Sequence, residues 1–365
     1  MKYSRVFIES FVAAFPEEIV TTDDLERRLE PLYSRLKLPE GRLELMTGIK
    51  ERRLWRKNTL PGTQSIETVR TLFEQTAFDR EKIGCFIHAS VCRDFLEPAT
   101  ACRVHEANRL PEHCAVYDVS NACLGLLSGV VQIANMIELG QIEAGIVVGT
   151  ECSRSLMEST IVQLNADQNL TRKNVKPAFA SLTIGSGSAA VLLTNEKLST
   201  TKNRLIGGVV RANTSQCRLC QSDGMAPIMQ TDSEKLMHEG VAVAKSAFDE
   251  FLPEIGWTRE SIQRTFCHQV GKTHQQLLFE TLKLDSALNF ATLPYLGNTG
   301  AVALPTAAAV GTQTGFVQSG ERVALLGIGS GINVVMLGVE WQKSIVDPKF
   351  QQLDAVKKIC EINPS

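Results

Sequence analysis

The sequence predicts an α/β fold, because short apolar runs alternate with longer amphipathic segments along almost the whole chain. A hydrophobic content of 44% and a charged content of 21% describe an ordinary globular protein, and 365 residues are enough for two units with their own cores. A weak internal repeat also suggests that the chain consists of two similar halves.

The predicted strands are runs of five to eight mostly apolar residues, which is the length of strands buried in a sheet. In chain order they lie at 83–90, 115–119, 144–150, 188–194, 204–211, 264–269, 322–327 and 332–339. The predicted helices lie at 22–35, 64–76, 99–107, 124–139, 233–251, 273–282 and 303–314. In the fourth helix, the strongly polar residues Gln132, Asn135 and Glu138 form one narrow stripe, so we expect its other sides to be buried.

The internal repeat consists of a long apolar helix, a glycine and charged segment, and a strand. Its first copy follows Cys123 and ends at Gly149, and its second copy follows Gly300 and ends at Gly327. The two final glycines are 178 residues apart, which is close to half the chain. We therefore expect an N-terminal half at 1–198, a C-terminal half at 199–343 and a charged tail at 344–365. Chance similarity in a glycine-rich protein is the alternative.

Composition excludes several classes of protein. With 38 basic and 40 acidic residues, the chain lacks the positive balance of a nucleic-acid-binding protein. Its first residues are too polar for a secretory signal, and no apolar run approaches the roughly 20 residues that cross a bilayer. Ten cysteines in such a chain favour free thiols and a cytoplasmic location. Cys217 and Cys220 form a CxxC motif without a second pair, so we expect neither a metal nor a cofactor.

Cys123 lies in the short connection between the predicted strand at 115–119 and the predicted helix at 124–139. A thiol at the first turn of a helix is close to unpaired N–H groups and to the positive end of the helix dipole, which both stabilise a thiolate. A small cysteine in the core is the ordinary alternative. We favour a nucleophile, because the setting fits two further segments.

Those segments carry side chains suited to acyl chemistry. His268 and Gln269 end an apolar strand, and Asn298 lies between two glycines just before a helix. Taken alone, the histidine could be an ordinary core or surface residue and the asparagine a helix cap. Beside a thiolate that accepts an acyl group, however, a His and Asn pair can stabilise an enolate oxygen. The glycine turn around Ser330 can supply backbone N–H groups to an acyl-enzyme oxyanion.

With these motifs in this order, the chain resembles a thiolase-superfamily condensing enzyme of the ketoacyl synthase III type. The motifs are Asn121-Ala-Cys123-Leu-Gly, His268-Gln269-Val, Gly297-Asn298-Thr-Gly300 and Gly329-Ser330-Gly331. The resemblance covers about residues 6–341 and implies a duplicated five-layer αβαβα fold and a homodimer. It implies that Cys123 is the nucleophile and that His268 and Asn298 form the enolate oxyanion hole. The backbone N–H groups of Cys123 and Ser330 would form the acyl oxyanion hole.

Within this superfamily, the chain most resembles OleA-type enzymes, which join two long-chain acyl-CoA molecules head to head. The resemblance is carried by residues 25–36, 47–55, 90–98 and 325–333. It implies that Glu97 enters the active site of the partner subunit as the base. Fatty-acid-initiating synthases tend to have an arginine where this chain has Met46, and Ala–Asn where it has Val270 and Gly271.

The need for a base separates the possible reactions. A malonyl thioester forms its carbanion by losing carbon dioxide, whereas a plain acyl thioester must lose a weakly acidic α-proton to a base. Glu97 in an apolar acyl channel would have a raised pKa and serve as that base, although a carboxylate before Pro98 could also be an exposed turn residue.

We therefore predict an acyltransferase that condenses two long-chain acyl-CoA or acyl-ACP molecules, without decarboxylation, to a 2-alkyl-3-oxoacyl product through an acyl-Cys123 intermediate. One alternative is a malonyl-dependent 3-oxoacyl-ACP synthase III. Another is a catalytically silent homologue that binds or dimerises, which the presence of Cys123, His268 and Asn298 disfavours.

Overall fold

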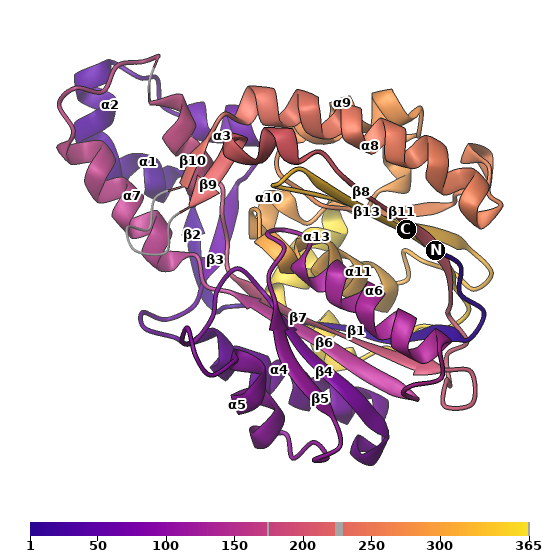
Figure 1. The fold of residues 1–365 in the computed structure, drawn as a ribbon. Helices are drawn as coiled ribbons and strands as arrows, with labels where there is room; N and C mark the ends of the chain where they lie inside the picture. The colour runs from indigo at the N-terminus through magenta and orange to yellow at the C-terminus, as the bar shows by residue number, and fades with distance from the viewer. Residues whose placement is uncertain (174, 223–228, 364–365) are drawn as a thin grey trace.

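The computed structural model describes residues 1–173, 175–222 and 229–363. Through this part of the chain runs a mixed sheet of nine strands in the order β11-β12-β13-β8-β1-β7-β6-β4-β5 (Figure 1). The strands are β1 (Val6–Ala14), β2 (Glu18–Thr21), β3 (Glu51–Leu54), β4 (Ile83–Ala89), β5 (Ala115–Val119), β6 (Ala144–Glu151), β7 (Gly187–Asn195), β8 (Arg204–Ala212), β9 (Cys220–Ser222), β10 (Met229–Thr231), β11 (Arg264–Cys267), β12 (Arg322–Gly329) and β13 (Asn333–Glu340). The pairs β2–β3 and β9–β10 form two small separate sheets.

The helices surround and separate the strands. They are α1 (Thr22–Arg28), α2 (Glu30–Leu36), α3 (Arg42–Thr47), α4 (Pro61–Thr76), α5 (Thr100–Ala107), α6 (Gly125–Glu138), α7 (Arg154–Ala166), α8 (Ser233–Ile255), α9 (Lys272–Leu282), α10 (Leu293–Leu296), α11 (Ala303–Gln313), α12 (Pro348–Gln351) and α13 (Asp354–Glu361). None of those that the structure describes has both the length and the apolar character needed to cross a membrane.

The large sheet is two sheets of the same design joined at one point. β1 pairs with β7 along its length but meets β8 only where Phe7 lies opposite Arg204. On one side the order β1-β7-β6-β4 runs antiparallel, antiparallel, parallel, and on the other side β8-β13-β12-β11 runs in the same way. β5 extends the first set by pairing in parallel with β4. At the equivalent place in the second set, beside β11, there is only the parallel bridge between Thr265 and Asn289.

The strand pattern gives a structural reason for the internal repeat. Gly149 is the sixth residue of β6, and Gly327 is the sixth residue of β12, the strand in the equivalent place. The predicted boundary at 198/199 falls between β7 and β8, and the division into domains remains a proposal.

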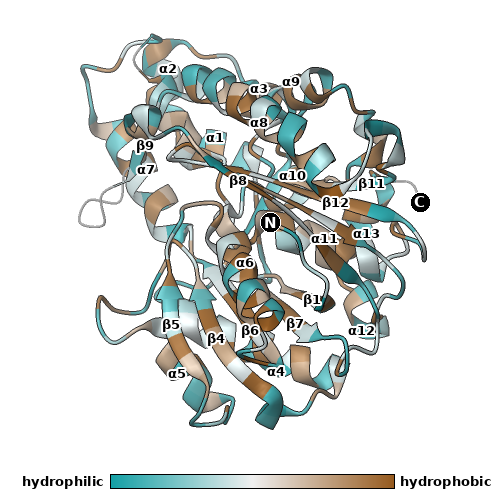
Figure 2. Cartoon of the chain, turned by 45° about the vertical axis from the view of Figure 1, so that its right-hand side comes forward, coloured by the Kyte–Doolittle hydropathy of each residue, from teal (hydrophilic) through white to brown (hydrophobic). Residues whose placement is uncertain are grey.

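The layers follow from which residues pack together. α6 and α11 lie between the two sheets, in a core that includes side chains of β1, β4, β7, β12 and β13. α4 and α5 cover the outer face of the first sheet, and α8 and α9 cover that of the second. The hydrophobic residues concentrate on the strands and on the helix faces that meet them (Figure 2). The predicted five-layer αβαβα fold is therefore confirmed.

Period-two alternation places strand residues in different layers. In β6, Val147 packs in the central core, while Ile146 and Val148 pack under α4. A strand buried on both faces reads as a continuous apolar run, which is why the sequence identified β6 so readily.

Several elements differ from the sequence prediction, and three of the differences bear on the architecture. The helix predicted at 22–35 is broken at Leu29, because Pro31 in the first turn of α2 has no N–H to continue α1. β1 was not predicted, because Glu9 and Ser10 interrupt its apolar run. α7 was not predicted either, and with α1 and α2 it forms a side lobe that has its own core.

The tail at 344–365 packs onto the body of the protein instead of extending from it. Val356 and Ile359 of α13 are fully buried in the central core. Lys358 lies 2.9 Å from Glu51 of β3 in an ion pair. Residues 364 and 365 lie outside the described residues.

Candidate active site

Cys123 lies in the connection between β5 and α6, two residues before the helix begins. Burial raises the pKa of its thiol to about 12, and the nearby Cys220 and Glu151 raise it further. The backbone N–H groups of Ser330 and of Cys123 itself lower the pKa but do not offset burial. The expectation that the helix terminus makes Cys123 a thiolate at rest is therefore wrong, because desolvation outweighs these N–H groups.

The end of β12 lies directly against Cys123. A side chain at Gly329 would have its Cβ 3.5 Å from the Cβ of Cys123 and 3.0 Å from Leu124, so only a glycine permits this approach. Asn333 at the start of β13 donates to the side-chain oxygen of Asn121 at 3.0 Å. The predicted partners Cys123 and Ser330 are thus brought together.

His268 follows the last residue of β11 and is 4% exposed. Its backbone N–H donates to Leu326 at 3.1 Å, which continues the pairing with β12. Burial, with a smaller contribution from His274, lowers the pKa of His268 to about 3, so the imidazole is neutral at neutral pH. Its Nδ1 atom has no hydrogen-bond partner among the described residues.

Asn298 is held in a turn by its backbone and by its own side chain. Its N–H donates to Thr183, and its carbonyl oxygen accepts from Gly185, both at 2.9 Å. The side-chain oxygen accepts from the N–H of Gly300 at 3.0 Å. This bond fixes which way the amide points, so that its NH₂ group faces away from the turn.

Gln269 connects the histidine to the segment that leads to Asn298. Its side-chain oxygen accepts from Thr292 at 2.8 Å and from Leu293 at 2.9 Å, and its NH₂ group donates to Phe290 at 2.8 Å. One buried amide therefore fixes the position of α10 relative to the end of β11, where His268 lies.

Glu97 lies apart from the other predicted site residues of the same chain. It is exposed on the loop between β4 and α5, and no hydrogen bond or ion pair of its carboxylate occurs among the described residues. Its neighbours Phe95 and Leu96 are 56% and 91% exposed. Within one chain, the structure does not bring Glu97 to Cys123.

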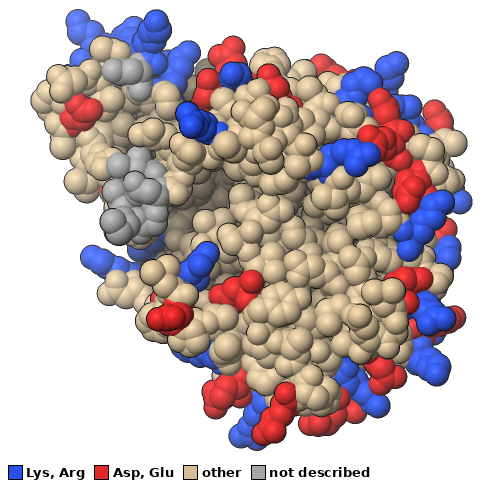
Figure 3. Space-filling view, in the orientation of Figure 1, with Lys and Arg blue, Asp and Glu red and all other residues tan. Residues whose placement is uncertain are grey.

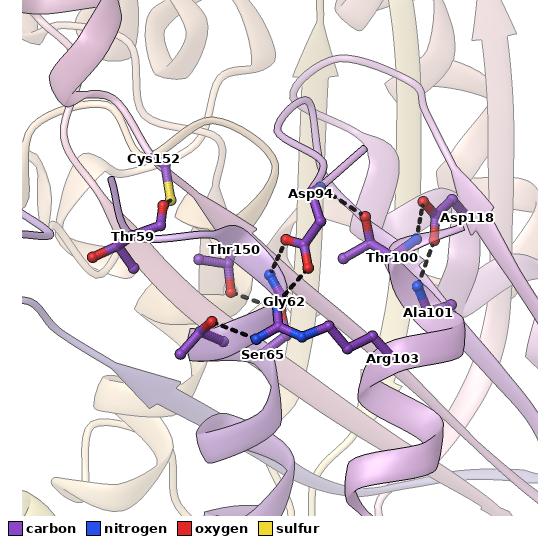
Figure 4. Close-up of polar contacts among 11 residues, drawn as sticks. Thr59, Gly62, Ser65, Asp94, Thr100, Ala101, Arg103, Asp118, Thr150 and Cys152 are labelled. Atoms are coloured by element: carbon purple, nitrogen blue, oxygen red, sulfur yellow. Dashed lines mark hydrogen bonds and ion pairs between the residues drawn. The ribbon is translucent and has the colours of Figure 1, made fainter. Parts of the chain in front are cut away.

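The base of this loop is firmly held by polar contacts of Asp94 (Figure 4), although Phe95 and Leu96 at its tip are exposed. The carboxylate of Asp94 accepts from the N–H of Gly62 at 2.7 Å and from Arg103 at 2.6 Å. The N–H of Asp94 donates to Thr100 at 3.1 Å. The side chain of Asp94 is 1% exposed, whereas its partner Arg103 reaches the surface.

Comparison with known proteins decides the family. The chain is 40% identical over 352 residues to an acyl-CoA:acyl-CoA alkyltransferase of Shewanella oneidensis, and the match covers 93% of this chain and 100% of that protein. The chain belongs to the acyl-CoA:acyl-CoA alkyltransferase family. A Xanthomonas campestris protein of the same name is 31% identical, with 93% and 100% coverage.

Solved structures and more distant relatives agree with this family. A variant of Xanthomonas campestris OleA superposes with a TM-score of 0.89 at 30% identity, covering 93% of this chain and 99% of that one. The OleA structure with bound lauric acid and lauroyl-CoA also has a TM-score of 0.89, with 30% identity and 93% and 100% coverage. A Bacillus cereus β-ketoacyl-[acyl-carrier-protein] synthase III is 26% identical, with 90% and 96% coverage.

Residues 252–341 match the family described as 3-oxoacyl-[acyl-carrier-protein (ACP)] synthase III C terminal. The predictions of a ketoacyl synthase III type enzyme and of a resemblance to OleA are therefore confirmed.

Two residues near Cys123 were not singled out from the sequence as parts of the site. Glu151 is the last residue of β6 and is 6% exposed, and Cys220 is the first residue of β9; both act on the pKa of Cys123. An acidic residue directly after the apolar run 144–150 was the available signal for Glu151. Cys220 is brought here by the fold alone, and it and Cys217 are free thiols.

The molecular surface is hollowed between the lobe of α1, α2 and α7 and the body of the two sheets (Figure 3). The atoms visible inside this hollow are mostly uncharged, while Lys, Arg, Asp and Glu gather on the outer faces.

Proposed function

We propose that the protein condenses two acyl-CoA molecules head to head without loss of carbon dioxide. The observation that carries this proposal is the 40% identity to an acyl-CoA:acyl-CoA alkyltransferase along almost the whole chain, with Cys123 beneath the N–H of Ser330. The proposed residues are Cys123, His268, Asn298 and Glu97, together with the backbone N–H groups of Cys123 and Ser330.

In the first step, the thiol of Cys123 attacks the carbonyl carbon of one acyl-CoA. A carbon–sulfur bond to Cys123 forms and the bond to the CoA sulfur breaks. The proton of the Cys123 thiol leaves with the CoA as its free thiol. The N–H groups of Cys123 and Ser330 stabilise the negative oxygen of the tetrahedral intermediate.

In the second step, a base removes an α-proton from the second acyl-CoA. We assign this role to Glu97 of the partner subunit. His268 and Asn298 donate hydrogen bonds to the resulting enolate oxygen, for which a neutral imidazole with one N–H is suited. The enolate carbon attacks the acyl-Cys123 carbonyl, a carbon–carbon bond forms, and the bond to the Cys123 sulfur breaks, so that the sulfur leaves as a thiolate. The proton taken up by Glu97 replaces the one that left with the first CoA, so Cys123 ends as a thiol and Glu97 as a carboxylate. The product is a 2-alkyl-3-oxoacyl thioester.

A homodimer gives the Glu97 loop a place to act. β5 is the last strand of the sheet order, so one of its edges is unpaired within the chain. Phe95 and Leu96 expose apolar surface beside it. We propose that a second copy covers this face through a twofold interface, which brings Glu97 into the other subunit's site. We also propose a cytoplasmic location, which agrees with ten free cysteines.

A malonyl-dependent 3-oxoacyl-ACP synthase III is the second candidate, supported by the family match over 252–341. Incubation of the purified protein with lauroyl-CoA alone, and then with malonyl-CoA added, separates the two. Product from lauroyl-CoA alone supports the proposal. Product only when malonyl-CoA is present would replace it with the second candidate. Comparison with lauroyl-ACP would identify the carrier.

A further inference from the structure

Glu151 occupies a place where two segments of the active site meet. Its carboxylate is buried at the end of β6, between the first residues of the Glu97 loop and the start of the helix that follows Asn298. One oxygen accepts from the N–H of Val91 at 3.0 Å and from the N–H of Ala301 at 3.3 Å. The other oxygen accepts from the N–H of Cys92 at 3.3 Å.

Gly300 connects the Glu151 carboxylate to Asn298. Gly300 donates to the side-chain oxygen of Asn298, and a Cβ at Gly300 would lie 3.3 Å from the carboxyl carbon of Glu151. The carboxylate therefore packs against the turn that orients the Asn298 amide, and it also holds the N–H of the next residue, Ala301. If the carboxylate moved, the turn would lose both a packing surface and an acceptor.

The same carboxylate fixes the start of the loop that ends at Glu97. Val91 and Cys92 leave β4 with their N–H groups directed at Glu151, and the thiol of Cys92 accepts from the N–H of Cys152 at 3.3 Å. Asp94 then holds the next turn of the loop against Gly62. Three N–H donors meeting one buried carboxylate favour its anion, while burial raises its pKa.

We propose that Glu151 is a positioning residue for carbon–carbon bond formation. Its carboxylate fixes the position of the Asn298 turn relative to the start of the Glu97 loop. The inference rests on the proposed function, because it takes Asn298 and Glu97 as parts of the condensing site. In a dimer in which Glu97 crosses to the partner, each Glu151 serves its own site through Asn298 and the partner's site through Glu97.

The first test separates acylation from condensation in Glu151→Ala. Misplacement of a reacting group by about 1 Å can cost about 10²-fold in rate, so we expect a condensation loss of that order. Acylation of Cys123 by lauroyl-CoA, followed by intact-protein mass, should continue. Glu151→Gln keeps one oxygen for Val91 and Ala301 and should retain more condensation activity. If Glu151→Ala does not fold, the split between the two steps is measured in Glu151→Gln.

Glu9→Gln is the matched control. Glu9 is also a buried carboxylate and is 2% exposed, but it lies in β1, where it accepts at 3.0 Å from the N–H of Thr200 in the connection between β7 and β8. We expect it to leave the ratio of the two steps unchanged. A second readout is the pH profile of Cys123 alkylation, which should shift to lower pH in Glu151→Gln because a negative charge beside the thiol is removed.

Mixed dimers test whether Glu151 has a two-sided role, that is, whether it acts on its own site through Asn298 and on the partner's site through Glu97. With Cys123→Ala in one subunit, only the other subunit has a nucleophile, and Glu151→Ala can be placed in either. We expect condensation to fall in both placements, through Asn298 in one and through Glu97 in the other. A defect confined to one placement overturns the two-sided role. Wild-type condensation by Glu151→Ala, or an equal loss of both steps, overturns the proposal. Failure of the wild type to condense acyl-CoA alone would instead contradict the proposed function.

Discussion

Cys123 and His268 are both neutral at rest, and burial is the first cause in each case. Removal from water disfavours a charged group, so it raises the pKa of a thiol and lowers that of an imidazole. The neutral histidine can still donate one hydrogen bond to an enolate. In the proposed mechanism, the thiol must lose its proton as it attacks, so we expect the acylation step to depend on substrate being in place.

The first prediction concerns the titration of Cys123. Because its pKa is raised to about 12, the thiolate fraction should grow about tenfold per pH unit through the neutral and mildly alkaline range. Alkylation by iodoacetamide, followed by mass spectrometry of the Cys123 peptide, should therefore keep rising with pH. A plateau near neutral pH would contradict this and restore the thiolate expected from the helix terminus.

The second prediction concerns the enolate oxyanion hole. His268→Ala and Asn298→Ala should each still form the acyl-enzyme at Cys123, while condensation falls by roughly 10²–10³-fold. Intact-protein mass measures acylation, and product formation from lauroyl-CoA measures condensation. Cys123→Ala serves as the control that forms no adduct. A folded variant that fails at acylation would show that the residue acts in the first step.

At this scale, the sequence identified residue types but not their protonation. Cys123, His268 and Asn298 could be singled out because each lies at a strand or helix end in a recognisable motif. The pKa of the Cys123 thiol depends on its burial and on Ser330, Glu151 and Cys220, which are far away in the chain, and no local pattern reports these contacts. Glu151 was passed over because a carboxylate after a strand reads as the beginning of a loop.

Among the elements, the loop between β4 and α5 combines a fixed base with an exposed tip. The buried carboxylates of Asp94 and Glu151 hold its first residues through hydrogen bonds, while Leu96 is 91% exposed. Such a loop loses little additional conformational entropy when it enters a partner's site, because its base is already ordered. Glu97 at its tip is thus suited to act outside its own subunit.

The third prediction tests this action in trans. Glu97→Gln keeps the shape of the side chain but removes its basicity, so acylation should survive while condensation of two acyl-CoA molecules collapses. Mixed dimers of Cys123→Ala and Glu97→Gln subunits should regain activity, because one site combines an intact Cys123 with an intact partner Glu97. Inactive mixed dimers would show that the glutamate acts within its own subunit. Normal condensation by Glu97→Gln would favour the malonyl-dependent reaction.

Element prediction succeeded where a pattern was continuous and failed where a single residue interrupted it. β6 and β12 are apolar throughout and were recognised. β1 was not, because Glu9 breaks its run, although Thr200 satisfies that carboxylate from across the fold. The break at Leu29 is a local effect of Pro31 that helical periodicity alone does not reveal.

At the scale of the whole molecule, the tail contributes to the core. The fourth prediction is that Ile359→Ala lowers the free energy of unfolding by about 2–5 kcal/mol, because it leaves a cavity at a fully buried site. Lys358→Ala, which removes partly exposed ion pairs with Glu51 and Asp354, should cost less than about 1 kcal/mol. Urea unfolding measures both. Equal effects would contradict the packing seen for α13.

The duplicated architecture could be inferred only in part from the sequence. Gly149 and Gly327 pointed to a repeat because both strands need a glycine at the same place, where a side chain would press on neighbouring backbone or helix atoms. The helix layers between and outside the sheets came from the family resemblance. They depend on contacts between distant segments, which periodicity within one segment does not encode.

The single residue pair that joins β1 to β8 has a consequence for biosynthesis. The first sheet is complete once Asn195 has left the ribosome, because all five of its strands precede that residue. The second sheet needs β13, which ends at Glu340. Between these two points of synthesis, one face of α6 is already packed on the first sheet. The opposite face, which later meets Gly327, is still exposed to water. We expect the partly folded chain to bind a holdase chaperone through this exposed face. The chaperone would release the chain when β12 and β13 pack over α6.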